Sequence, residues 1–157
     1  MKADDSKHIV QEFYRHFGRA DVDGMAAMLG DDLEWWVLSK PHLFSLAGTR
    51  KKPEMLQLWE SIFELLDGPM TMDIVGLVVE DDKVAVELRS HATTKAGKIY
   101  ENDYHMLFAI RGGQIVKARE YTDLLYINDV FGSHGPRTNI DERTAETAVT
   151  DRERTSR

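Results

Sequence analysis

The chain has 157 residues, enough for one domain with a single hydrophobic core. Its net charge of −7 argues against a nucleic-acid partner, which requires a basic face, and against an anionic membrane surface. The absence of cysteine excludes disulfides, thiolate catalysis and cysteine-ligated zinc. Because no apolar run reaches the length of a signal peptide or a membrane span, we expect a cytoplasmic protein.

Three helices are predicted in the first part of the chain. In residues 4–17, apolar side chains recur on one stripe and charged side chains lie opposite, which is typical of an amphipathic helix. Asp21 is a suitable N-cap for a short second helix that ends at Gly30. Pro53 suits the first turn of a third helix with a wide apolar face, which Gly68 terminates.

The remaining elements are mostly predicted strands. A short β-rich run precedes the third helix and four strands follow it, at residues 33–38, 71–79, 83–93, 100–110 and 115–122. Gly112 and Gly113 provide the positive φ angles of a tight hairpin between the last two strands. A short helix is predicted to close the domain at residues 124–131. Helices followed by an antiparallel meander indicate an α+β fold rather than alternating βαβ units.

Residues 133–157 differ in composition from the rest of the chain. They are polar, carry mixed charges and offer too little apolar surface to offset the entropy cost of ordering. We therefore predict one domain at residues 1–132 and a disordered polar tail at residues 133–157. A segment that binds a partner is the alternative interpretation of this tail.

Two stretches of the chain resemble a known superfamily. HIVQEFYRHFGRADVDGMAAMLGDDLEW and YENDYHMLFAIRGGQIVKAREYTD are similar to the opening and the ending of nuclear transport factor 2-like proteins. This superfamily includes ketosteroid isomerases, limonene epoxide hydrolases and SnoaL-like polyketide cyclases. The resemblance covers residues 8–131. It implies a cone-shaped, curved antiparallel sheet wrapped around three N-terminal helices (a cystatin-like roll), with a deep apolar pocket at the open end and often a dimer through the sheet.

Strand parity decides which side chains of residues 83–93 can reach that pocket. Val84, Val86 and Leu88 share one face, and Glu87, Arg89 and His91 share the other. Taken alone, this alternation places the valine face in the core and the charged face in solvent. The resemblance implies the reverse, because an Arg-x-Asp pair on this strand of the epoxide hydrolases points into the pocket. The matching tripeptide here is Arg89-Ser90-His91.

The resemblance also supplies a candidate carboxylate. Arg119-Glu120-Tyr121-Thr122-Asp123 matches a hydrolase motif whose first aspartate is catalytic, which puts Glu120 at that position. We expect His91 or Glu120 to be the catalytic base, Arg89 to set their charge, and Tyr104 to stabilise an enolate-like oxygen. The remaining pocket residues, expected to contact the substrate, are Trp35, Trp59, Asn102 and Met106.

Departures from the known patterns leave the chemistry open. His91 replaces the second aspartate of the epoxide hydrolases, and Trp35 and Val37 replace the tyrosine and asparagine that position water, so epoxide hydrolysis is doubtful. In the ketosteroid isomerases the catalytic aspartate corresponds approximately to Trp36 and the helix-one tyrosine to Phe13. SnoaL-like cyclases carry a histidine on the strand of His91 and an acid/base aspartate near residues 103–105.

Three functions therefore remain from the sequence. The first is cofactor-independent isomerisation, cyclisation or dehydration of a largely apolar carbonyl compound. The second is a non-catalytic ligand-binding or interaction module, and the third is epoxide hydrolysis with an altered triad. Structural alternatives exist for each candidate: a cross-strand ion pair between Arg89 and Glu120, a surface position for His91, and core packing for Tyr104. No metal or nucleotide cofactor is expected, since the chain has neither metal-ligand spacing nor a glycine-rich phosphate loop.

The reversed parity carries a prediction about assembly. It places apolar side chains on the outside of the cone, namely Val84, Val86, Leu88, Leu107 and Ala109. An apolar patch of this kind usually marks an interface. We therefore predict a two-fold homodimer through the outer sheet face.

Overall fold

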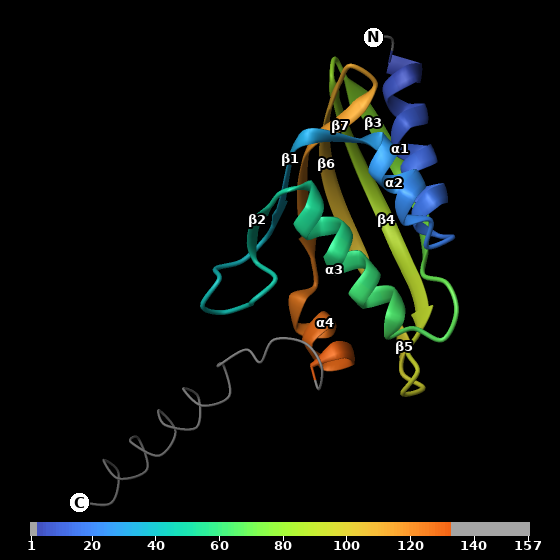
Figure 1. Cartoon of the computed structure of the whole chain (residues 1–157), viewed down its shortest axis with the longest axis vertical. Coiled ribbons are helices and arrows are strands. Elements are labelled where there is room, and N and C mark those ends of the chain that lie inside the picture. Colours follow the sequence, from blue (N-terminus) through green and yellow to red (C-terminus); the bar gives the residue numbers. More distant parts are fainter. Residues whose placement is uncertain (1–2, 133–157) are drawn as a thin grey trace, which may run out of the picture.

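The computed structural model describes residues 3–132, which form four helices and a seven-stranded sheet (Figure 1). The helices are α1 (Ala3–Phe17), α2 (Val22–Met28), α3 (Lys52–Glu64) and α4 (Leu124–Phe131). The strands are β1 (Leu29–Val37), β2 (Gly48–Arg50), β3 (Thr71–Glu80), β4 (Lys83–Thr93), β5 (Ile99–Tyr100), β6 (Asp103–Arg111) and β7 (Gln114–Thr122). The expected α+β class is confirmed, and so are the three N-terminal helices. The predicted tail at residues 133–157 lies outside the described residues.

Polar caps fix where the short helices begin. The Asp21 side chain accepts a hydrogen bond of 3.0 Å from the Gly24 backbone N–H at the start of α2. Asp123 does the same for α4, accepting from the Tyr126 N–H at 3.1 Å. In α3, the Lys51 N–H donates to the Glu54 carboxylate at 2.8 Å. Each cap satisfies a backbone group that a helix end otherwise leaves unpaired.

The sheet is curved and mixed, with the strand order β2-β1-β7-β6-β4-β3. Strands β3, β4, β6 and β7 form the predicted antiparallel meander, but β1 pairs with β7 in parallel. The sequence-based expectation of a wholly antiparallel sheet was therefore wrong at this edge. After β1 the chain continues into β2 and α3, and β7 later runs alongside β1 in the same direction. Strand patterns in the sequence do not specify such a pairing between distant segments.

Helices cover the inner face of the sheet, which is where the core lies. In Figure 1, α1, α2 and α3 lie on one side of the strands, and α1 contacts β3 and β4 while α3 contacts β1. Val84, Val86 and Leu88 are fully buried on this inner face. The reversed parity inferred from the resemblance was wrong, and the simple alternation of β4 was right: its apolar side packs against the helices because burying those side chains is the main stabilising contribution.

Within residues 3–132, no helix is long and apolar enough to cross a membrane. The same residues contain no group of three or more histidine, aspartate or glutamate side chains that could hold a metal ion. The cytoplasmic location remains a prediction.

Candidate functional site

An apolar cavity lies between the inner face of the sheet and the helices. Its volume is ≈ 90 Å³, and side chains of α1, α3, α4 and five strands line it. Its aromatic wall is tightly packed: the rings of Trp35 and Trp59 lie 4.9 Å apart, and the Phe13 ring lies 5.9 Å from that of Trp35. Rings at these distances and tilts stabilise a wall that keeps its shape around a ligand.

Glu120 is the carboxylate among the residues that line this cavity. It lies on β7 opposite Met106 of β6 and Val37 of β1, so two neighbouring strands fix its backbone. The Trp35 indole Nε1–H donates a hydrogen bond of 2.8 Å to its Oε2. Among the described residues no hydrogen bond to Oε1 is found, and Glu120 lines the cavity.

The surroundings of Glu120 change its acidity. Burial among apolar side chains raises the pKa of the carboxyl above its ordinary value, while the Trp35 hydrogen bond and the charge of Arg50 oppose that rise without cancelling it. A carboxyl group with a raised pKa both accepts and donates protons closer to neutral pH than an exposed one does. This perturbation, in a cavity, is typical of functional groups, although structural carboxyls show it as well.

Tyrosine hydroxyls lie around the same cavity. Tyr14 of α1, Tyr100 of β5 and Tyr104 of β6 all line it. Burial raises the pKa of Tyr104 and of Tyr14 well above the ordinary value, and the negative charge of Glu120 adds to both. Burial likewise raises the pKa of Tyr100 to about 12. These groups therefore stay protonated and act as hydrogen-bond donors.

The hydroxyl of Tyr104 has a defined partner. It forms a hydrogen bond with the hydroxyl of Tyr100, which also accepts a 3.0 Å bond from the Asn102 side-chain amide. The bond between the two hydroxyls can run in either direction, because the Tyr100 oxygen can accept from Asn102 and still either donate to or accept from Tyr104. When Tyr100 is the donor, the Tyr104 proton is available to an acceptor in the cavity.

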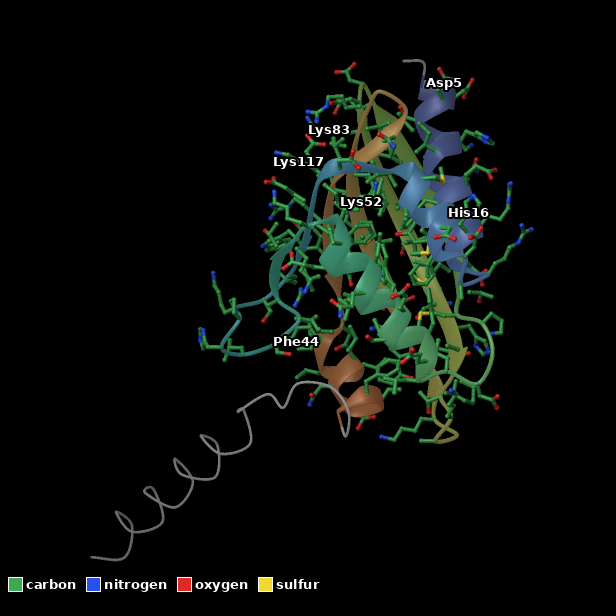
Figure 2. All side chains as sticks on the ribbon, viewed as in Figure 1. Asp5, His16, Phe44, Lys52, Lys83 and Lys117 are labelled. Carbon is green, nitrogen blue, oxygen red and sulfur yellow. The ribbon has the colours of Figure 1, made fainter. Side chains whose placement is uncertain are left out.

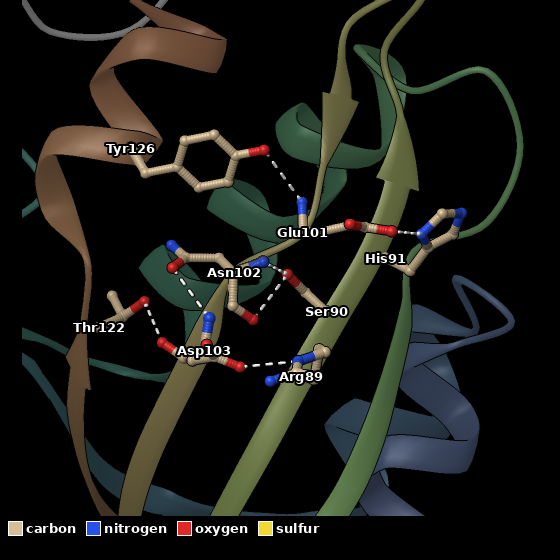
Figure 3. A network of polar contacts seen from close by, with 8 residues as sticks. All are labelled: Arg89, Ser90, His91, Glu101, Asn102, Asp103, Thr122 and Tyr126. Atoms are coloured by element: carbon tan, nitrogen blue, oxygen red, sulfur yellow. Dashed lines mark hydrogen bonds and ion pairs between the residues drawn. The ribbon is translucent and has the colours of Figure 1, made fainter.

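Asn102 organises the strand junction behind these tyrosines (Figure 3). Its backbone N–H donates to the Ser90 hydroxyl at 2.9 Å and its carbonyl accepts from the Ser90 N–H at 2.8 Å, so β5 and β6 keep one register opposite β4 across the break between them. The side-chain amide also donates to the Asp123 carbonyl at 3.1 Å. Asn102 is buried behind the cavity wall and does not line it, contrary to the expected substrate contact.

Arg89 and His91 do not reach the cavity. Both lie on the outer face of β4: Arg89 donates to Asp103 at 2.9 Å, and His91 Nδ1 lies 2.8 Å from the Glu101 carboxylate (Figure 3). These side chains are 64% and 57% exposed. The expected convergence of Arg89 and His91 with Glu120 was therefore wrong, because the alternation that buries Leu88 and Ser90 turns both residues outward. Arg89 does form a cross-strand ion pair, but with Asp103 rather than Glu120.

The other predicted pocket residues lie where they were expected. Tyr104, Glu120, Trp35, Trp59 and Met106 all line the cavity. Their roles in catalysis or binding remain predictions.

Two groups of lining residues were missed in the sequence. Tyr14 lies four residues after the buried Val10, so the helical period of α1 contained the signal that it faces inward. Phe44 and Leu46 belong to the loop between β1 and β2, for which the sequence has no periodic pattern.

Comparison with protein families identifies the chain. The family model for the SnoaL-like domain matches residues 10–118, which is most of the described fold. The protein belongs to the SnoaL-like domain family. This membership confirms the resemblance to nuclear transport factor 2-like proteins, and the cavity described above is the pocket of a SnoaL-like domain. Among curated proteins, no sequence matches the chain.

Solved structures share this fold. An NTF2-like protein of Burkholderia thailandensis E264 has 25% sequence identity and a TM-score of 0.69, covering 83% of this chain and 98% of its own. IdmH, a proposed polyketide cyclase from Streptomyces antibioticus, has 17% identity and a TM-score of 0.67, covering 81% and 98%. TerC, crystallised with polyporic acid, has 17% identity and a TM-score of 0.70, covering 82% and 98%.

Proposed function

We propose that this SnoaL-like domain is a cofactor-independent acid/base enzyme that transfers a proton on a small, largely apolar carbonyl compound. The observation that carries the proposal is Glu120, a carboxylate that lines an apolar cavity, is held by Trp35 through one oxygen, and has a raised pKa. The proposed relation of IdmH to polyketide cyclisation supports carbonyl chemistry on this scaffold without specifying a substrate.

The proposed step is enolisation, which underlies isomerisation, cyclisation and dehydration of carbonyl compounds. The Glu120 carboxylate removes a proton from the carbon next to the carbonyl. The electron pair of that C–H bond forms a C=C bond to the carbonyl carbon, and the π pair of the C=O bond moves to the oxygen. The Tyr104 hydroxyl donates a hydrogen bond to the resulting enolate. Glu120, now protonated, returns the proton at the same or another carbon. Trp35 holds the carboxyl group through Oε2 while Oε1 carries out the transfer.

This assignment changes the roles expected from the sequence. Arg89 and His91 are exposed on the opposite face and take no part in the step. Their place near Glu120 is taken by Trp35 and Tyr104. Epoxide hydrolysis has less support, because it requires groups that hold and activate water, and the indole of Trp35 donates but cannot accept a hydrogen bond.

A ligand-binding module is the second candidate. The observation that favours it is that Glu120 is the sole carboxylate, and that no lysine, arginine or histidine is found, among the residues lining the cavity. Binding requires only the cavity, whereas proton transfer requires Glu120 to be free to exchange its proton.

Deuterium exchange separates these candidates. The protein is incubated in deuterium oxide with enolisable apolar ketones, and incorporation of deuterium next to the carbonyl is measured by NMR. Glu120→Gln should lower the exchange rate by the ~10²–10⁴-fold typical of a lost general base, at unchanged or higher melting temperature. Glu87→Gln removes an exposed carboxylate from the outer face of β4 and is the matched control.

Exchange that is unchanged in Glu120→Gln would end the catalytic proposal. Ketone binding by the wild-type protein without exchange would instead favour the ligand-binding module.

We also propose a homodimer through the outer sheet face, with a different set of residues from those expected. Val84, Val86 and Leu88 are buried inside, so they cannot form the interface. The apolar side chains that do lie on the outer face are Val78, Ala85 and Leu107, in one row across β3, β4 and β6, and Trp36 of β1. Arg119 of β7 stands between Leu107 and Trp36 in this row, and its guanidinium lies 4.0 Å from the centre of the Trp36 ring. Light scattering should give a dimeric mass that Leu107→Glu reduces to that of a monomer. A monomeric wild-type mass would contradict the proposal.

A further inference from the structure

A second cavity adjoins the one that contains Glu120. Its volume is ≈ 150 Å³, and it lies among α3, α4 and the loop between β1 and β2. The two cavities share five lining residues, which are Phe44, Leu46, Leu58, Ile62 and Ile127. Because they share these side chains, the two cavities adjoin: a deep chamber at Glu120 and an outer chamber towards α4.

Polar groups are distributed unequally between the chambers. The deep chamber has the carboxyl of Glu120 and the hydroxyl of Tyr104. In the outer chamber the polar side chains are those of Ser61 and Asn128, and the Ser61 hydroxyl already donates to the Gln57 carbonyl at 2.9 Å. A ligand group in the outer chamber therefore gains mainly from removing apolar surface from water.

Neither chamber is lined by a lysine, arginine or histidine side chain. In the outer chamber any charged ligand group would lose its hydration without gaining a paired charge, and in the deep chamber an anionic group would face the Glu120 carboxylate. The outer chamber therefore fits an uncharged group, and the carbonyl head proposed for the deep chamber is uncharged as well.

The loop that contributes Phe44 and Leu46 to both chambers is held by Arg50 of β2. Its guanidinium donates to the backbone carbonyls of Leu46 at 2.5 Å and Ser45 at 3.0 Å. Phe44 of this loop lies beside α4, at the opposite end of the sheet from Lys83 (Figure 2). The exposed apolar side chains Leu43 and Leu125 stand on the same loop and helix.

We propose that the site takes an elongated, uncharged molecule with a compact carbonyl head in the deep chamber and an unbranched apolar tail in the outer chamber. The direction of the head rests on the proposed function of Glu120, whereas the use of both chambers does not.

The first test measures how tightly the full chain binds a series of linear methyl ketones, from pentanone to dodecanone. Binding is monitored through the fluorescence of Trp35 and Trp59 in the deep chamber. Each added methylene should tighten binding by about three- to fourfold until the outer chamber is filled. Affinity that does not depend on chain length would overturn the two-chamber proposal. Decanoate and decylammonium should bind more weakly than decanone, and tighter binding of either ion would overturn the uncharged class.

Ser61→Trp tests the outer chamber directly. Ser61 is an exposed position of α3 that lines only the outer chamber, and the larger side chain should fill it. Decanone should then lose at least about tenfold in affinity while pentanone keeps its own. The neighbouring exposed position provides the control, and Glu60→Trp should change neither ketone. Equal losses for both ketones in Ser61→Trp would contradict the assignment.

The outcomes separate this inference from the proposed function. If ketone affinity still depends on chain length in Glu120→Gln and the wild type shows no deuterium exchange, the two-chamber inference stands and the proposed enzymatic function is wrong. If the wild type shows deuterium exchange but ketone affinity does not depend on chain length, the enzymatic function stands and the elongated ligand is wrong.

Discussion

Glu120→Gln should change how the stability of the protein depends on pH. The folded protein holds the proton of Glu120 more tightly than the unfolded chain does, because burial raises the pKa of the carboxyl in the folded state. Between the ordinary and the raised value, the folded state binds more protons, so the free energy of unfolding falls as pH rises. The glutamine variant lacks this group and therefore lacks this loss.

The magnitude follows from the same linkage. The free energy of unfolding contributed by this one group falls by at most about 1.4 kcal/mol per pH unit in that window. In a domain of this size, 1 kcal/mol corresponds to roughly 3 °C in melting temperature. Glutamine keeps an oxygen that accepts the Trp35 N–H, so the hydrogen bond of 2.8 Å can be retained. The variant should thus match the wild type below the ordinary carboxyl pKa and exceed it in alkaline solution.

Thermal unfolding of both proteins at a series of pH values from about 4 to about 9 measures the difference. Glu87→Gln is the control for losing one negative charge, since that side chain is exposed on the outer face. Melting curves of wild type and Glu120→Gln that run parallel across this range would refute the raised pKa. A variant that is less stable at alkaline pH would show that Glu120 is a paired structural charge.

Four further variants test the placement of individual side chains. Arg89→Ala and His91→Ala should leave deuterium exchange and melting temperature nearly unchanged, because both ion pairs are exposed, and a large loss of exchange would contradict their position. Trp35→Phe removes the hydrogen bond that lowers the pKa of Glu120, so the pH profile of exchange should move to higher pH; an unmoved profile would show that the indole does not control the carboxyl. Asn102→Ala should cost about 2–3 kcal/mol in urea unfolding, since it leaves the Tyr100 hydroxyl and the Asp123 carbonyl without their donor, and a neutral result would contradict the network.

The sequence predicted the site only where local pattern and resemblance agreed. Glu120 was placed by its motif on the last strand, and Tyr104 and Met106 share its inward face. The resemblance predicted Arg89 and His91 at the pocket, and this prediction was wrong. The alternation of buried and exposed residues along β4 by itself places both side chains in solvent.

Other parts of the site depend on contacts between distant segments. Trp35 and Glu120 are 85 residues apart, and they meet because β1 pairs in parallel with β7. The loop that contributes Phe44 and Leu46 is held by hydrogen bonds from the Arg50 guanidinium to its backbone carbonyls. Such bonds leave no periodic pattern of apolar residues in the sequence. Neither feature follows from the propensities of single segments, so the outer chamber became visible only in the structure.

The most direct test of the central claim is the titration of the Glu120 carboxyl itself. Carbon-13 NMR of protein labelled at the glutamate carboxyl carbons, with Glu120→Gln used to assign the missing signal, follows this one group as pH changes. Its midpoint should lie above the ordinary carboxyl value, because burial in the cavity raises the pKa. A midpoint at or below the ordinary value would contradict the account, since Glu120 would then be a solvated or ion-paired carboxylate rather than a proton-transferring group in an apolar site.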